Sequence, residues 1–159
     1  MDGVRGTGNG QGGTGYGERG TGKGKRDMGN GGREMIKDFT DLRVWQKAKE
    51  LVLEVYKISK DFPKDERFGL TEQLRRAANS VCANIAEGFE RYHTKDKIKF
   101  YYNARGSISE CKSHLLVSLD LSYLSKDEAA ELVSRFNCVG YLLNNMISAL
   151  SRAAFSRSE

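Results

Sequence analysis

The chain has 159 residues, a net charge of +5 and a pI near 9.1, and 14 of its 18 glycines fall within the first 32 residues. Beyond that stretch the length supports one domain of ordinary size. No apolar run approaches the roughly 20 residues that span a bilayer, and no apolar secretory signal opens the chain. Three cysteines without CxxC spacing favour a reducing, cytoplasmic setting over a disulfide framework.

Residues 1–37 are predicted to form a disordered, glycine-rich basic tail, because they have almost no large apolar side chains to offset chain entropy. They carry seven Lys/Arg against four Asp/Glu. Three interpretations stay open: a flexible RNA-binding arm, an inert linker, or a stretch upstream of a true start at Met28 or Met35. Residues 38–159 are predicted to form the folded domain. With one proline and four glycines, this domain lacks the turn signals of a β fold and favours long helices.

The first helix is expected from about residue 41 to 60, with Thr40 or Asp41 as its N-cap. Phe62-Pro63 ends it, because the residue before proline avoids helical geometry. An apolar stripe at helical spacing faces the core: Val44, Ala48, Leu51, Val55, Ile58 and Phe62. A second stripe, formed by Trp45, Val52 and Tyr56, lies about 100° round the helix. This wider burial predicts an interface with another subunit.

The second helix is expected over residues 70–90 and the third over 94–121. The apolar seam of the second is Leu70, Leu74, Ala77, Ala78, Val81, Ile85 and Phe89. The expected core positions of the third are Ile98, Tyr101, Ala104, Ile108, Leu115, Leu116 and Leu119. Arg105 and Lys112 interrupt that stripe, and a buried Arg105 would need an acidic partner. Glu110 lies five residues on, at poor spacing for a same-helix pair, so Glu87 on the neighbouring helix is the predicted partner in a structural ion pair.

The fourth helix is expected over residues 126–152, where Ser125 and Glu128 fit a capping box. Its apolar stripe contains Phe136, Gly140, Leu143, Ile147 and Leu150. Four helices of about 20 residues joined by short loops favour antiparallel neighbours. The predicted fold is therefore all-α, an antiparallel up-down-up-down four-helix bundle.

The sequence resembles a family of four-helix-bundle proteins encoded in intervening sequences of 23S rRNA genes. The segments that carry the resemblance are Asp41–Ala48 (DLRVWQKA), Phe62-Pro63, Leu74–Ala78 (LRRAA), Asn84–Gly88 (NIAEG), and Ala104–Ser107 (ARGS) with Glu110. It covers about residues 35–159. The family is similar in fold to the accessory proteins of diversity-generating retroelements, which form homopentamers with a basic, nucleic-acid-binding surface. The resemblance thus implies a homopentamer and association with RNA or DNA.

In an antiparallel bundle, the start of the first helix, the connection between the second and third, and the end of the fourth share one end. This end is slightly basic, whereas the opposite end is slightly acidic. Phosphate attraction grows with the number of cations that neutralise it, so the basic end is the predicted nucleic-acid surface. Its predicted contacts are Arg43, Lys47, Lys49, Arg91, Lys95, Lys97 and Lys99.

No feature of the sequence indicates an enzyme, a metal site or a cofactor. His93 and His114 lack further ligands at useful spacing, Cys111 and His114 do not form a recognisable nucleophilic pair, and phosphate-loop signatures are absent. The predicted function is a non-enzymatic, oligomeric, nucleic-acid-associated accessory protein. The alternative is a scaffolding oligomer that binds a protein partner.

Overall fold

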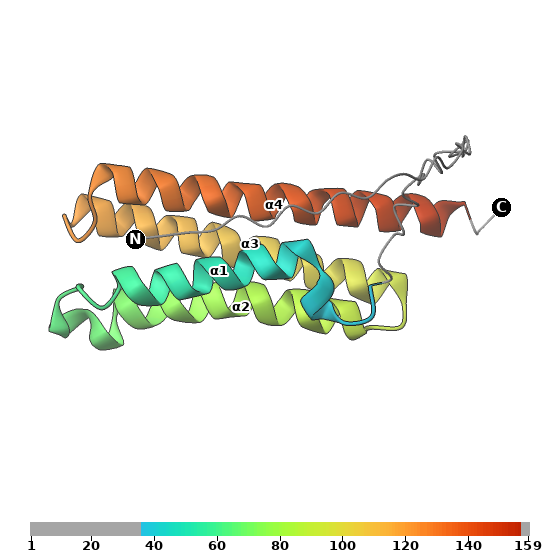
Figure 1. Ribbon diagram of the computed structural model, residues 1–159, viewed down its shortest axis with the longest axis horizontal. Helices are drawn as coiled ribbons and strands as arrows, with labels where there is room; N and C mark the ends of the chain where they lie inside the picture. Colours follow the sequence, from blue (N-terminus) through green and yellow to red (C-terminus); the bar gives the residue numbers. More distant parts are fainter. Residues whose placement is uncertain (1–35, 157–159) are drawn as a thin grey trace, which may run out of the picture. The chain divides into compact units, whose positions relative to one another are not determined.

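The computed structural model describes residues 36–156 as an assembly of four long helices and two short 3-10 turns (Figure 1). Its elements are η1 (Phe39–Asp41), α1 (Arg43–Ile58), η2 (Lys64–Phe68), α2 (Leu70–Glu90), α3 (Thr94–Asp120) and α4 (Lys126–Phe155). Successive helices pack against each other, α1 closes on α4, and the described residues contain no strand. The all-α, antiparallel four-helix bundle is confirmed. Except for residues 36 and 37, the expected disordered tail lies outside the described residues.

The start of α1 differs from the expected one. Neither Thr40 nor Asp41 caps α1; Asp38 is the side-chain cap of the preceding turn η1, where it accepts a 2.8 Å hydrogen bond from the Thr40 N–H. The Asp41 carboxylate accepts in return from the Asp38 N–H at 3.1 Å. These polar residues therefore build the separate turn η1, and α1 begins at Arg43 behind Leu42, which makes no side-chain cap bond.

The start of α4 confirms the predicted capping box. The Glu128 N–H donates to Ser125 Oγ at 3.2 Å, and the Ser125 N–H donates to Glu128 Oε2 at 2.9 Å. Hydrogen bonds from Ser125 hold the pKa of the Glu128 carboxyl below its usual value. The reciprocal bonds satisfy two otherwise orphan donors and define where the helix starts.

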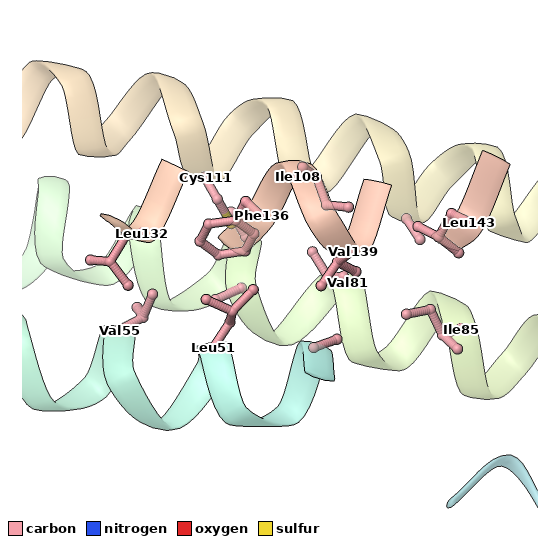
Figure 2. Packing of buried hydrophobic residues seen from close by; sticks show 14 of the residues in the cluster. Leu51, Val55, Val81, Ile85, Ile108, Cys111, Leu132, Phe136, Val139 and Leu143 are labelled. Carbon is pink, nitrogen blue, oxygen red and sulfur yellow. The ribbon is translucent and has the colours of Figure 1, made fainter. Parts of the chain in front are cut away.

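The apolar stripes of all four helices meet in one core, with Phe136 near its middle and Leu51, Val81 and Cys111 around it (Figure 2). On α3 the expected core is partly wrong, because Leu116 is 50% exposed. The buried positions of α3 are Tyr101, Ala104, Ser107, Ile108, Cys111, Leu115 and Ser118. Steps of three and four residues lead from Cys111 to Leu115 and Ser118, so Leu116 is turned about 100° away from the core.

Small residues let α2 and α3 approach closely along their shared face. Gly88 of α2 is buried, and a β-carbon added there would lie 2.6 Å from Cε1 of Tyr101. Nearer the middle of the pair, the Ser80 and Ser107 hydroxyls are hydrogen-bonded at 2.9 Å. The α2–α3 pair is accordingly the most extensive helix contact in the bundle.

The expected ion pair between Glu87 and Arg105 does not form. Arg105 is exposed, and its guanidinium lies 5.5 Å from the centre of the Tyr102 ring. Glu87 pairs instead with Arg91, four residues along α2. Arg105 directly follows the buried Ala104, and one position along a helix rotates the side chain away from the buried stripe. The Arg105 side chain therefore points to solvent, where it needs no buried acidic partner.

Candidate nucleic-acid interface

One end of the bundle gathers the start of α1, the α2–α3 connection and the end of α4 (Figure 1). The seven predicted phosphate contacts come from the first two of these segments, so the antiparallel topology brings them to the same end. We call this the α2–α3 connection end. Its residues were predicted as one surface, but the structure shows that their cationic groups are not equally available.

Four of the seven cations have intramolecular partners. Lys47 pairs with Glu50 at 3.8 Å, and Arg91 pairs with Glu87. Lys97 donates its ammonium hydrogen bond to the carbonyl of Phe89 in the last turn of α2, where it satisfies an otherwise unpaired acceptor. The remaining one, Lys49, places its ammonium 5.4 Å from the centre of the Trp45 ring.

Arg43, Lys95 and Lys99 are exposed and make no ion pair within residues 36–156. Of the seven, they are the cations that a phosphate could contact without displacing a partner. Glu90 and Asp96 are also exposed there, so the field of this end is weak and contacts at unpaired cations would decide binding.

The second apolar stripe of α1 is partly accounted for within one chain. Trp45 is half-buried and makes an edge contact with Phe39, with ring centres 5.1 Å apart. Val52 packs partly against the core. The Tyr56 ring is the most exposed of the three, although its hydroxyl accepts a 3.0 Å hydrogen bond from Asn79. An oligomer interface at these three residues stays a prediction.

The opposite end of the bundle divides into two surfaces of opposite charge, which the sequence reasoning missed. A hollow between α1 and α4 is lined by Glu54, Asp61, Glu128 and Glu131, with Lys57 and Arg135 as its cations. The cations of η2 and early α2 lie on a different face, beside Phe68. The summed charge of this end is slightly negative, because the acidic face between α1 and α4 and the basic face beside Phe68 nearly cancel. The two faces become distinct only when the charges are assigned to helix faces.

The described residues support neither a three-ligand metal site nor a Cys111–His114 nucleophilic pair. Within them, no group of three His, Cys, Asp or Glu side chains could hold a metal ion. Burial raises the pKa of the Cys82 thiol to about 11 and that of Cys111 to about 12. A thiol held in its protonated form is a poor nucleophile, so the pairing of Cys111 with His114 has no chemical support.

We expect iodoacetamide at pH 8 to modify Cys138 rapidly in the folded protein, and Cys82 and Cys111 only after unfolding. Cys138 is exposed, whereas the other two thiols are held protonated by burial. Mass spectrometry of intact protein measures the labelling, and Cys138→Ser is the control that removes the fast site. Rapid labelling of Cys111 in folded C138S would contradict the burial.

The same shifts predict a loss of stability at high pH. A thiol whose pKa is raised by folding stabilises the folded state fully below its ordinary pKa of 9.0. This contribution declines as the pH rises through about 11 and 12. Thermal melts between pH 8 and 11 should therefore show a falling melting temperature.

The geometry defines a class of protein: a helical bundle with charged, solvent-exposed ends and no helix long and apolar enough to cross a membrane within the described ranges. The family model described as 23S rRNA-intervening sequence protein matches residues 40–145. The chain belongs to this family.

A solved structure supports the fold independently. It is a protein of unknown function from the S23 ribosomal protein family of Bacteroides thetaiotaomicron VPI-5482. The two chains are 20% identical and superpose with a TM-score of 0.62 over 66% of this chain and 95% of the other. No curated protein matches the sequence.

Proposed function

We propose that this protein is a non-enzymatic, cytoplasmic accessory protein that associates with RNA through the phosphate backbone. The observation that carries the proposal is the exposure of Arg43, Lys95 and Lys99 at one end of the bundle, without ion-pair partners among the described residues. Membership of a family named for the intervening sequences of 23S rRNA favours the proposal of RNA over DNA. Such contacts bind phosphate with little base preference.

The test is charge reversal at the α2–α3 connection end. We expect Lys95→Glu/Lys99→Glu to weaken binding of a 20-nucleotide single-stranded RNA at least about ten-fold, and to reduce the slope of log K against log salt by about 1.4. Fluorescence anisotropy at several salt concentrations measures both. Because the two side chains are exposed, the melting temperature should stay close to that of the wild type.

The matched control is Lys57→Glu/Lys126→Glu, which makes the same charge change at the opposite end. Lys57 forms only an exposed pair with Glu54 at 3.9 Å, and such pairs contribute little to stability. The affinity of K57E/K126E for the RNA should fall much less than that of K95E/K99E. Equal losses in the two variants would show that overall charge, not this end, governs binding, and an unchanged affinity of K95E/K99E would refute the site.

A second function is favoured by the apolar surface of α1. Leu53 and Tyr56 are both exposed there, which suits an oligomer that scaffolds a protein partner. The family resemblance implies a homopentamer, and the second apolar stripe of α1, formed by Trp45, Val52 and Tyr56, is its proposed interface. Light scattering with and without RNA separates RNA association from scaffolding. Scaffolding is supported if the molar mass of the oligomer is the same with RNA and after nuclease treatment, and if a protein partner stays bound.

A further inference from the structure

A basic, aromatic surface opens where the end of α1, η2 and the start of α2 meet. Two adjoining hollows, of about 620 and 380 Å³, share the residues Arg67, Phe68, Thr71 and Arg75. We call the pair the Phe68 hollow. Each lies within the size range of small-ligand sites in proteins. They lie at the end of the bundle opposite Lys95 and Lys99 (Figure 1).

The Phe68 side chain lines both hollows and is 79% exposed. A single exposed apolar side chain is ordinary on a protein surface. This ring differs because the buried Phe62 and the exposed Pro63 line one of the same hollows, and the Arg67 guanidinium lies 5.3 Å from its centre. The hollow thus offers an accessible aromatic face bordered by cations.

Cations outnumber carboxylates along the lining. The charged residues of the two hollows are Lys60, Lys64, Arg67, Arg75, Arg76 and Glu72. Arg76 is paired with Glu110 of α3. Three more carboxylates adjoin the lining in sequence. Glu66 accepts hydrogen bonds from the Leu70 N–H at 2.9 Å and the Tyr123 hydroxyl at 3.2 Å, whereas Asp61 and Asp65 are exposed beside Lys60 and Lys64. Within the lining itself, the remaining cations are opposed by Glu72.

Arg75 is held in place by α1. Its Nε donates a 2.7 Å hydrogen bond to the hydroxyl of buried Ser59, and its guanidinium lies 4.9 Å from the centre of the Tyr56 ring. Because its guanidinium is already fixed in this way, Arg75 loses little further side-chain entropy when it contacts a phosphate. The surface is thus partly organised before any ligand arrives.

We propose that the Phe68 hollow binds an unstacked nucleotide of a single-stranded nucleic acid. The base stacks on the Phe68 ring, and the adjoining phosphates contact Lys64 and Arg67. Aromatic faces and tracking cations are the two components of single-strand recognition, and a duplex cannot supply a base without unstacking it. The inference rests on the proposed function for its class of ligand and adds a second site and a preference for single strands.

The test compares Phe68→Ala with the wild type in binding to a fluorescent 12-nucleotide oligouridylate and to a 12-base-pair RNA duplex. We expect F68A to bind the single strand roughly ten-fold or more weakly, with an unchanged salt slope and unchanged duplex binding. Phe68→Trp should keep the affinity. Lys64→Ala/Arg67→Ala should instead reduce the salt slope by about 1.4.

Tyr141→Ala is the matched control, because Tyr141 is 65% exposed and lies on α4, outside both the hollow and the α2–α3 connection. It should bind the oligouridylate as the wild type does. Since Phe68 is outside the core, the melting temperature of F68A should be close to that of the wild type. An F68A affinity equal to that of the wild type overturns the proposal, as does tighter binding of free uridine monophosphate than of the oligonucleotide.

Two more measurements separate the hollow from a subunit interface and from the site at the opposite end. A lower molar mass of F68A by light scattering would make the hollow an interface between copies of this chain and overturn the proposal. If K95E/K99E binds normally while F68A does not, the phosphate site of the proposed function fails and the Phe68 hollow stands. The converse result leaves the proposed function and removes the hollow.

Discussion

Replacing Phe136 by alanine is expected to lower the free energy of unfolding by about 3–5 kcal/mol. The ring is 1% exposed and packs at the centre of the core, among residues from the other helices (Figure 2). Truncation removes the transfer free energy of the ring and leaves a cavity that the rigid helices around it fill only in part. Urea denaturation followed by circular dichroism measures the loss.

The control for this variant is Tyr141→Ala on the same helix. Tyr141 is exposed, so its loss should change the free energy of unfolding by less than about 0.5 kcal/mol. A similar small change for F136A would mean that Phe136 does not hold the core together.

Two glycine-to-alanine substitutions are expected to act in opposite directions. At Gly88 the new β-carbon would lie 2.6 Å from Cε1 and 2.9 Å from Cδ1 of the buried Tyr101 ring. The resulting overpacking costs about 1–3 kcal/mol, which exceeds the gain of up to about 1 kcal/mol in helix propensity. We expect Gly88→Ala to destabilise the protein by about 1–2 kcal/mol.

Gly106→Ala is the matched control on α3, because no atom lies within 4 Å of a β-carbon added there. Only the propensity gain remains, so G106A should be more stable than the wild type by up to about 1 kcal/mol. Urea midpoints of the two variants test the pair. If both variants changed the free energy of unfolding in the same direction, the approach of α2 to α3 at Tyr101 would not be tight.

Local patterns were sufficient for the elements of the fold. The apolar spacing of Leu74, Ala78, Val81 and Ile85 predicted α2 with its observed bounds, because periodicity is a property of a single helix. The Ser125–Glu128 box predicted the start of α4, since both of its bonds form within four residues.

The errors occurred where a residue lies beside a stripe or where two polar caps compete. Arg105 and Leu116 each follow a buried residue by one position, and one position turns a side chain about 100°. At the start of α1 three polar residues could act as the cap, and the turn η1 used Asp38. The choice depends on the hydrogen bonds of η1 as a whole, in which the Asp41 carboxylate accepts from the Asp38 N–H.

The candidate sites depended on the packing of the helices. Sequence and topology placed Lys95 and Lys99 at one end, but whether a cation is free depends on neighbours such as Glu87 for Arg91. The Phe68 hollow combines residues of α1, η2 and α2. Its positive charge is not evident from the sequence, because the net charge of that end also includes the acidic residues of the α1–α4 face. Faces, unlike ends, depend on how each helix is rotated.

The sequence by itself thus determined the class of fold, the helices and the family, because local periodicity and short motifs are written along the chain. Tertiary structure decided which charges pair, which thiols are held protonated and where an aromatic ring is exposed among cations. Those outcomes depend on the rotation and axial offset of each helix against its neighbours, which arise from packing the whole core.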